Sequence, residues 1–243
     1  MTDRRPFSTP LRLLDDARPA PRERAAGPSA SPLPHRTPAP PLLDEPSLFY
    51  DPPYADPVHD TFAWHLVKYL KPGSGLRHQV DGPRAPTVDL GIDFVVEQGT
   101  WRVGFMCGAS DAGREHDRRC DALRIGQAAV DVLYRLRAED VEARLHDALL
   151  LVAKWDAALF SERGRINLNT LATSEARAVH PGPDDTVVTV AYDAAREAVE
   201  ADTLRIVRVS RSHPEGWRPV YEQARRAAGL PAGPPPKRWA RSA

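Results

Sequence analysis

Acidic residues recur along the stretch TVDLGIDFVVEQGTWRVGFMC, residues 87–107, which reads as two strands joined by a tight turn. Successive side chains of a strand point to opposite faces, so Asp89, Asp93 and Glu97 are expected to share one face of the first strand. Carboxylates in this arrangement are typical of a divalent metal site, because Mg²⁺ prefers oxygen ligands and is usually held by one or two carboxylates. Such a metal polarises a phosphoryl oxygen and activates water, so the chemistry that this pattern suggests is phosphodiester hydrolysis.

The second ligand of such a site has to come from another element. Asp89 and Asp93 lie about 13 Å apart along an extended strand, so one ion cannot bind both unless the strand bends. The second strand offers Phe105 and Cys107, where a metal-dependent nuclease would place a glutamate and a lysine. A thiolate is a soft ligand that suits Mg²⁺ poorly, and it cannot replace a lysine that stabilises negative charge.

His116 and Asp117, at the start of the next predicted helix, are candidates for completing the site. Each candidate also has an ordinary structural interpretation. Asp89 can be satisfied by backbone groups or an arginine, and Asp93 can be a solvent-facing residue of an alternating strand. A His-Asp pair at a helix start can serve as a cap with solvated charge, and Cys107 can be a core residue.

The hydrophobic pattern predicts the elements that position these residues. A helix is expected over residues 60–70, with Asp60 as its N-cap and a stop at Pro72-Gly73. Residues 75–82, 87–97 and 100–107 follow as three strands, then residues 109–129 as a helix, 130–137 as a strand and 138–160 as a helix. In the second strand, one face is expected to carry Leu90, Ile92, Phe94 and Val96. The prediction is a mixed α/β layer built on an antiparallel meander.

The C-terminal part is predicted as an α/β extension. Residues 161–185 are polar and interrupted by Gly and Pro, which favours a long loop. Residues 186–192 and 203–211 predict strands, and residues 215–230 predict a helix that ends at Gly229.

The order helix, three-stranded meander, helix, strand resembles the restriction-endonuclease-like, or PD-(D/E)XK, fold. Over residues 89–136 the chain resembles the very-short-patch-repair endonucleases and their bacterial relatives. Asp89 in TVDLGID takes the place of the family aspartate, and GFMCG lies where a glutamate-containing strand end is expected. HDRRCDAL resembles the family's helix start, VDVLYRL its next strand, and RAEDVEARL the stretch that leads into the last helix.

The resemblance implies a DNA endonuclease that uses Mg²⁺ or Mn²⁺, with Asp89 as a metal ligand. The candidate catalytic residues are Asp89, Asp93, His116 and Asp117. Three positions depart from the family pattern, since Phe105, Cys107 and Cys120 stand where a glutamate, an acidic residue or lysine, and an arginine are expected. The resemblance therefore implies a nuclease fold whose active site is degenerate.

Composition divides the chain into four parts. Residues 1–56 form a Pro-rich arm with no sustained apolar period, which is expected to be mostly disordered because it cannot bury enough surface to offset its ordering entropy. Residues 57–160 are expected to form the core, 161–230 the extension packed on it, and 231–243 a flexible tail. No apolar run approaches the length of a membrane span, and the N-terminus lacks the apolar segment of a signal peptide, so a cytoplasmic location is expected. The two cysteines show no disulfide or zinc spacing and are expected to be buried thiols.

The formal net charge is zero, with 33 basic and 33 acidic residues, so a nucleic-acid-binding surface would have to be local. The candidates on the helix after the meander are Arg114, Arg118 and Arg119, which alternate with acidic residues in a pattern that also fits a salt-bridged surface. A second basic stripe is conceivable if the C-terminal strand and helix lie side by side. It would involve Arg205, Arg208, Arg211, Arg225 and Arg226, near Trp217, Tyr221 and Trp239.

Three hypotheses follow. The first is a degenerate nuclease relative that binds nucleic acid or protein. The second is an active Mg²⁺- or Mn²⁺-dependent DNA endonuclease that uses Asp89 with Asp93, His116 or Asp117. The third is an interaction scaffold that recruits a protein partner through its Pro-rich arm.

Overall fold

The computed structural model describes residues 54–82, 88–108, 114–192 and 203–230, all of which belong to one unit that spans Leu43–Ala243. The predicted tail and all but three residues of the predicted arm lie outside the described residues. The elements are α1 (Pro57–Tyr69), β1 (Gly75–Val80), β2 (Ile92–Gln98), β3 (Trp101–Cys107), α2 (Arg114–Gly126), β4 (Val132–Leu136), α3 (Ala138–Trp155), η2 (Ala157–Leu159), α4 (Glu162–Leu171), α5 (Ser174–Ala178), β5 (Val187–Ala191), β6 (Thr203–Ser210) and α6 (Pro214–Ala227).

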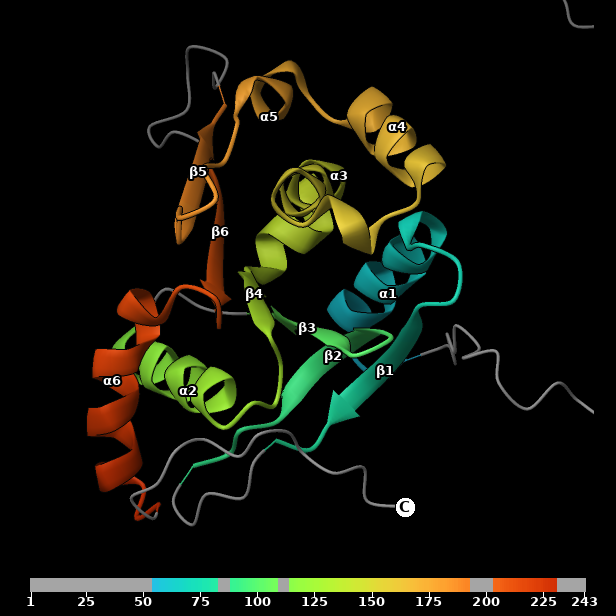
Figure 1. The fold of residues 1–243 in the computed structure, drawn as a ribbon. Helices are drawn as coiled ribbons and strands as arrows, with labels where there is room; N and C mark the ends of the chain where they lie inside the picture. The colour runs from blue at the N-terminus through green and yellow to red at the C-terminus, as the bar shows by residue number, and fades with distance from the viewer. Residues whose placement is uncertain (1–53, 83–87, 109–113, 193–202, 231–243) are drawn as a thin grey trace, which may run out of the picture. The chain divides into compact units, whose positions relative to one another are not determined.

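In the described part of the chain, six strands form one mixed sheet in the order β1-β2-β3-β4-β6-β5, accompanied by six α-helices (Figure 1). The strands β3 and β4 are parallel, and every other neighbouring pair is antiparallel. A parallel pair needs a crossover connection, which α2 supplies. The predicted α/β class is confirmed, as is the order of helix, antiparallel meander, helix, strand and helix.

Two apolar clusters cover the two faces of the sheet. The larger one packs α1 and α3 against one face and extends to β5 and β6 through Val188, Val190, Leu204 and Ile206. The smaller one packs α2 and α6 against the other face of β2, β3 and β4. The predicted helix of residues 138–160 is found as α3, whose residues Val141, Leu145, Leu149 and Val152 are all buried in the larger cluster.

The hairpin between β2 and β3 turns through two residues, and Gly99 adopts a φ of 56°, which glycine reaches without steric cost. The predicted alternation holds along β3, where Val103, Phe105 and Cys107 face α1 and α3. It fails along β2: Ile92 lies in the α2 cluster, whereas Phe94 lies in the α1 cluster. Two residues that should share a face therefore point to opposite faces, and the regular pleat is interrupted around Asp93.

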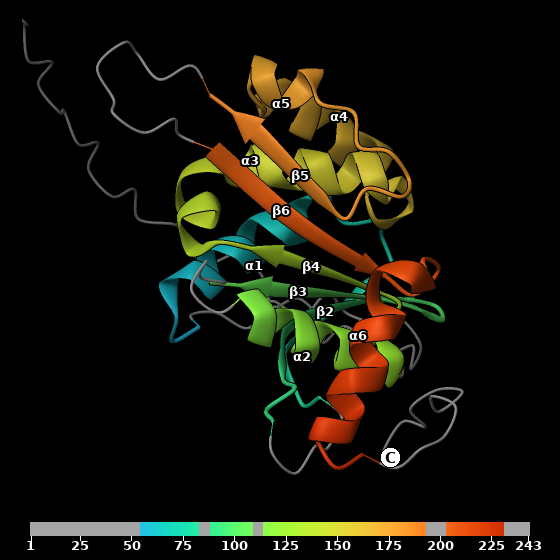
Figure 2. The ribbon, with the colours of Figure 1, turned by 90° about the vertical axis from the view of Figure 1, so that its left-hand side faces the viewer.

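The helices α2 and α6 approach closely at Gly126. A Cβ atom at this position would lie 2.3 Å from the ring of Tyr221, so a side chain here would separate the two helices. The side-chain amide of Gln127 donates a hydrogen bond to the Tyr221 hydroxyl over 2.7 Å. The close contact of these two helices, visible in Figure 2, fixes α6 beside α2.

Two details of the predicted secondary structure are wrong. The N-cap of α1 is Asp56, which accepts from the amide of Val58 over 2.8 Å, and not Asp60. Residues 161–185 are not one long loop, because they contain α4 and α5. Both of these short helices are capped by hydroxyl side chains, with Ser161 accepting from Gly164 and Thr173 from Ala176, which stabilises them despite their few buried residues.

Candidate functional site

Asp89 lies just before β2, with its side chain in solvent. Its Oδ1 accepts a hydrogen bond from the amide of Gly91 over 2.8 Å, the geometry of an Asx turn. The guanidinium of Arg124 donates to the carbonyls of Leu90 and Gly91 at 2.9–3.2 Å and holds this segment from the α2 side. A backbone amide thus satisfies one oxygen of the predicted metal ligand, whose side chain is exposed.

Asp93 is the carboxylate that points into a cluster of titratable groups. Its Oδ2 accepts a hydrogen bond from the backbone amide of Cys107 over 2.7 Å, so it bridges β2 and β3 beyond their ladder. The same oxygen lies 3.6 Å from Nε2 of His59 on α1. The side chain of Asp93 is 22% exposed, and that of His59 is 10% exposed.

His59 in turn contacts His78 on the edge strand β1. Nδ1 of His59 and Nε2 of His78 lie 3.1 Å apart, so one ring donates a hydrogen bond to the other. The ring of Tyr54 stacks on His78 with a centroid distance of 4.1 Å. Burial, together with the charge of His59, lowers the pKa of His78, although Asp93 opposes the shift. We call His59, His78 and Asp93 the histidine–aspartate array; it connects α1, β1 and β2.

Phe105 and Cys107, the two β3 residues that depart from the pattern expected from the resemblance, both face α1 and α3. Phe105 is fully buried and stacks between Phe62 and Tyr134 at centroid distances of 5.2 and 5.5 Å. Burial raises the pKa of the Cys107 thiol well above its ordinary value, and the charge of Asp93 adds to the shift. Cys107 is thus a protonated core residue, and the prediction of buried thiols is confirmed for it and for Cys120.

His116 and Asp117 lie near the start of α2, on the opposite side of the sheet from α1. Nε2 of His116 contacts Sγ of Cys120 at 3.4 Å, and the carboxylate of Asp117 lies 3.3 Å from the guanidinium of Arg135. The contacts of Asp93 are with α1 and β3, whereas those of Asp117 are with β4. The structure therefore joins Asp93 to a histidine that was not predicted and leaves Asp117 in a different network.

The donor groups around Asp93 do not fit a hard divalent cation. Mg²⁺ and Mn²⁺ need mostly oxygen ligands, and the array offers one carboxylate, already bonded to an amide, beside two imidazoles. In the part of the chain that the structure describes, no group of three His, Cys, Asp or Glu side chains could hold a metal ion. The residues predicted for a Mg²⁺ or Mn²⁺ site thus do not converge on such a site.

The predicted nucleic-acid-binding arginines lie on α2, which begins at Arg114. Arg118 is exposed, and Arg119 pairs with Glu115 one turn earlier at 3.0 Å. The second basic stripe, which was expected only if the C-terminal strand and helix lay side by side, does not form along β6. Arg205 lines a cavity beside α2, whereas the guanidinium of Arg208 turns to the opposite face and binds Asp156 at 3.2 Å.

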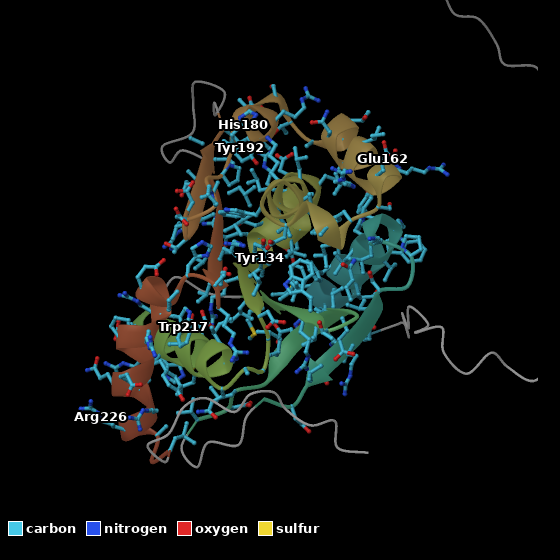
Figure 3. The ribbon with its side chains drawn as sticks, viewed as in Figure 1. Tyr134, Glu162, His180, Tyr192, Trp217 and Arg226 are labelled. Carbon is cyan, nitrogen blue, oxygen red and sulfur yellow. The ribbon has the colours of Figure 1, made fainter. Side chains whose placement is uncertain are left out.

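A cavity of about 460 Å³ lies between α2, the C-terminal end of β4, β6 and the start of α6. Asp117 and Arg118 line it from α2, Arg205 from β6 and Trp217 from α6. The cavity brings together one predicted catalytic residue and one predicted nucleic-acid contact with C-terminal residues that lie about 90 positions away in the chain. Figure 3 shows Trp217 on the inner side of α6, whereas Arg226 projects outward from the same helix.

A buried network forms one side of this region. The carboxylate of Asp121, 3% exposed, accepts from Arg124 over 3.0 Å and from Arg135 over 2.7 Å. Burial alone would lower the pKa of Arg135, but the hydrogen bonds and charge of Asp121 raise it above its ordinary value. These three residues join α2 to β4 and to the backbone that precedes β2.

Partly buried histidines predict a pH dependence of stability. Burial lowers the pKa of His65, with His146 and Lys68 contributing, and burial also lowers the pKa of His146. A folded-state pKa below that of the unfolded chain favours the neutral form, so the associated stability is present above about pH 6.5 and is lost as the pH falls.

We expect the urea midpoint to decrease as the pH is lowered from 7.5 to 5.5. The double change His65→Gln, His146→Gln should make this decrease smaller. His180→Gln, at an exposed position, is the matched control, and an equal slope in all three proteins would contradict the assignment.

The sequence did not reveal His59 and His78, because each is an isolated histidine, one on a helix and one on an edge strand. Both elements precede β2 in the chain, and the two histidines meet only through tertiary packing.

No protein-family model matches this chain, and no curated protein or solved structure is significantly similar to it.

Proposed function

We propose that the protein is a catalytically degenerate relative of the restriction-endonuclease-like nucleases and that it binds nucleic acid without cleaving it. The arrangement of α1, the β1–β3 meander, α2 and a β4 strand parallel to β3 supports the relationship. The observation that carries the proposal is the burial of Phe105 and Cys107 at the strand end where this fold would place the residues that complete its metal site.

The groups at Asp89 and Asp93 support the absence of cleavage. Phosphodiester hydrolysis in this fold class needs a metal that polarises a phosphoryl oxygen and activates water. Asp93 is one carboxylate beside two imidazoles, and Asp89 is exposed and bonded to the Gly91 amide. Both carboxylates accept hydrogen bonds from backbone amides, and among the described residues neither belongs to a group of three His, Cys, Asp or Glu side chains that could hold a metal ion.

Arginines on α2 and in the cavity beside it support binding of nucleic acid. Arg118 is exposed at the rim, and Arg205 reaches the cavity from β6. Arginine is suited to phosphate and base contacts because its planar guanidinium donates several hydrogen bonds in a fixed geometry. A protein partner remains the alternative, and the tests below separate it from nucleic acid.

Binding is expected to be sensitive to salt. Fluorescence anisotropy with a labelled duplex and a labelled single strand, across a series of salt concentrations, should show affinity that falls as salt rises, because phosphate contacts release counterions. Arg118→Glu should weaken binding about tenfold at low salt and reduce the salt slope by about one or two units.

The matched control is Arg163→Glu, which makes the same charge change at an exposed position of α4, a helix of the α1 and α3 side. It should leave the affinity nearly unchanged. Affinity that does not depend on salt, or an equal loss in both variants, would reject nucleic-acid binding through α2 and would favour the protein-partner alternative.

A further inference from the structure

The cavity beside α2 borders a sheet face that no described helix covers. Along β5, Val188 and Val190 are buried against α3, whereas Thr189 and Ala191 are exposed and Val187 keeps 43% of its surface in solvent. Figure 2 views this open face of β5 and β6, with α2 and α6 side by side next to it. The volume of about 460 Å³ lies in the range of pockets that enclose a small organic ligand.

The walls of the cavity combine flat apolar surface with hydrogen-bonding groups of both kinds. Val187, Val207 and Val209 supply apolar contact from β5 and β6. Arg118 can donate from α2, and Glu215 can accept from α6; both side chains are exposed, and neither has an ion pair among the described residues. A donor from α2 and an acceptor from α6 therefore both line the cavity.

The charges of the cavity disfavour a bare anion. Five carboxylates line it, against four arginines other than Arg208, whose guanidinium turns to Asp156 on the opposite face, so positive charge is not in excess. Arg135 is already bound by Asp121 and Asp117, and His213 pairs with Asp184 at 2.9 Å. An inorganic phosphate would meet no surplus of positive charge, whereas a neutral ligand with both donors and acceptors could pair with an arginine and with a carboxylate.

Trp217 adds an observation that is independent of the charges. This side chain lines the cavity and is only 7% exposed, yet its Nε1 has no hydrogen-bond acceptor in the described part of the chain. The Nε1 atom itself has less than 1 Å² of accessible surface, so what the indole offers a ligand in the cavity is contact with its ring.

We propose that this cavity binds a nucleobase, recognised by Arg118 and Glu215 on its polar edge and by the valines and Trp217 around its ring. A nucleobase is a flat heterocycle that carries both donors and acceptors, and arginine and acidic side chains pair with such edges. The base can belong to a free nucleoside or to an unpaired position of a strand held in a pocket. This assignment goes beyond the proposed function, because it specifies a ligand that binds even without a phosphate backbone.

The full chain is titrated with each of four free nucleosides, and isothermal titration calorimetry measures the binding. Inorganic phosphate is the comparison probe. We expect saturable binding of at least one nucleoside at about millimolar or lower concentration and none of phosphate. Val207→Trp fills the cavity from β6 and should weaken binding by at least about tenfold. Thr189→Trp introduces the same side chain on the open face of β5 at a position that does not line the cavity, and it should leave the affinity nearly unchanged.

Saturable binding that Val207→Trp removes and Thr189→Trp preserves supports the assignment. Absence of saturable nucleoside binding, binding of phosphate alone, or equal effects of the two tryptophans would overturn it. A duplex with one unpaired base, compared with a fully paired duplex, distinguishes the two sources of the base: tighter binding of the former, lost in Val207→Trp, indicates a strand, and equal binding indicates a free nucleoside. If DNA binding fails while nucleoside binding persists, the proposed function is wrong and the cavity assignment stands; the reverse result rejects only the assignment.

Discussion

Replacing Asp121 with alanine is expected to lower the free energy of unfolding by about 3–5 kcal/mol, because removal of one member of a buried ion pair leaves an uncompensated charge. The change removes the carboxylate from both Arg124 and Arg135, whose side chains are 6% and 11% exposed. Arg124 also donates to the carbonyls of Leu90 and Gly91, so the segment before β2 should be loosened as well. Urea unfolding followed by circular dichroism measures the loss.

The matched control removes an exposed acidic residue from the same helix. Glu115→Ala deletes the partner of Arg119 in a pair whose side chains are 63% and 47% exposed, and it should cost less than about 0.5 kcal/mol. A loss of less than about 1 kcal/mol for Asp121→Ala, a value typical of an ordinary single hydrogen bond, would contradict the role of the network.

Replacing Asp147 with alanine is the second change for which we expect a large effect. Its carboxylate, on α3, accepts from the amide and hydroxyl of Thr173 over 2.7 and 2.8 Å and from the hydroxyl of Tyr192 over 2.6 Å. Burial and this hydrogen bond raise the pKa of Tyr192 above its ordinary value. The change should cost about 3 kcal/mol, because each buried donor left without an acceptor costs about 1–3 kcal/mol and some will regain water.

The loss of stability in Asp147→Ala should affect the elements next to this residue as well as the global free energy of unfolding. Thr173 caps α5 and Tyr192 follows β5, so amide hydrogen exchange should rise in these elements before it rises in β2 and β3. Asp147→Asn keeps one carbonyl acceptor and should cost less than the alanine variant. Equal stability of Asp147→Ala and the parent protein would show that the three hydrogen bonds contribute nothing net.

The parts of the fold that follow a strong hydrophobic period were predictable from the sequence. The helix α3 has a buried residue at almost every turn of one face, and β3 alternates as a strand buried against α1 should. The helices α4 and α5 were missed because they bury few residues, Gly164 and Leu168 in α4 and Ala176 in α5. Their capping hydroxyls at Ser161 and Thr173 were the available signal.

The candidate site was harder to predict because its geometry depends on tertiary contacts. Strict alternation places Ile92 and Phe94 on one face, but the pleat is interrupted near Asp93. That carboxylate lies near His59, which in turn contacts His78, and these contacts form only when the chain folds. The position of β6 beside β4 likewise results from a pairing between segments about 70 residues apart, which local pattern does not specify.

The central claim, that this fold binds nucleic acid and does not cleave it, is tested most directly by one incubation. The full chain is mixed with supercoiled plasmid and with single-stranded DNA in Mn²⁺, at protein concentrations where anisotropy shows binding, and the products are resolved on a gel. We expect bound DNA that is neither nicked nor shortened. Cleavage by the parent protein that Asp89→Ala or Asp93→Asn abolishes would contradict the claim and would establish an active endonuclease.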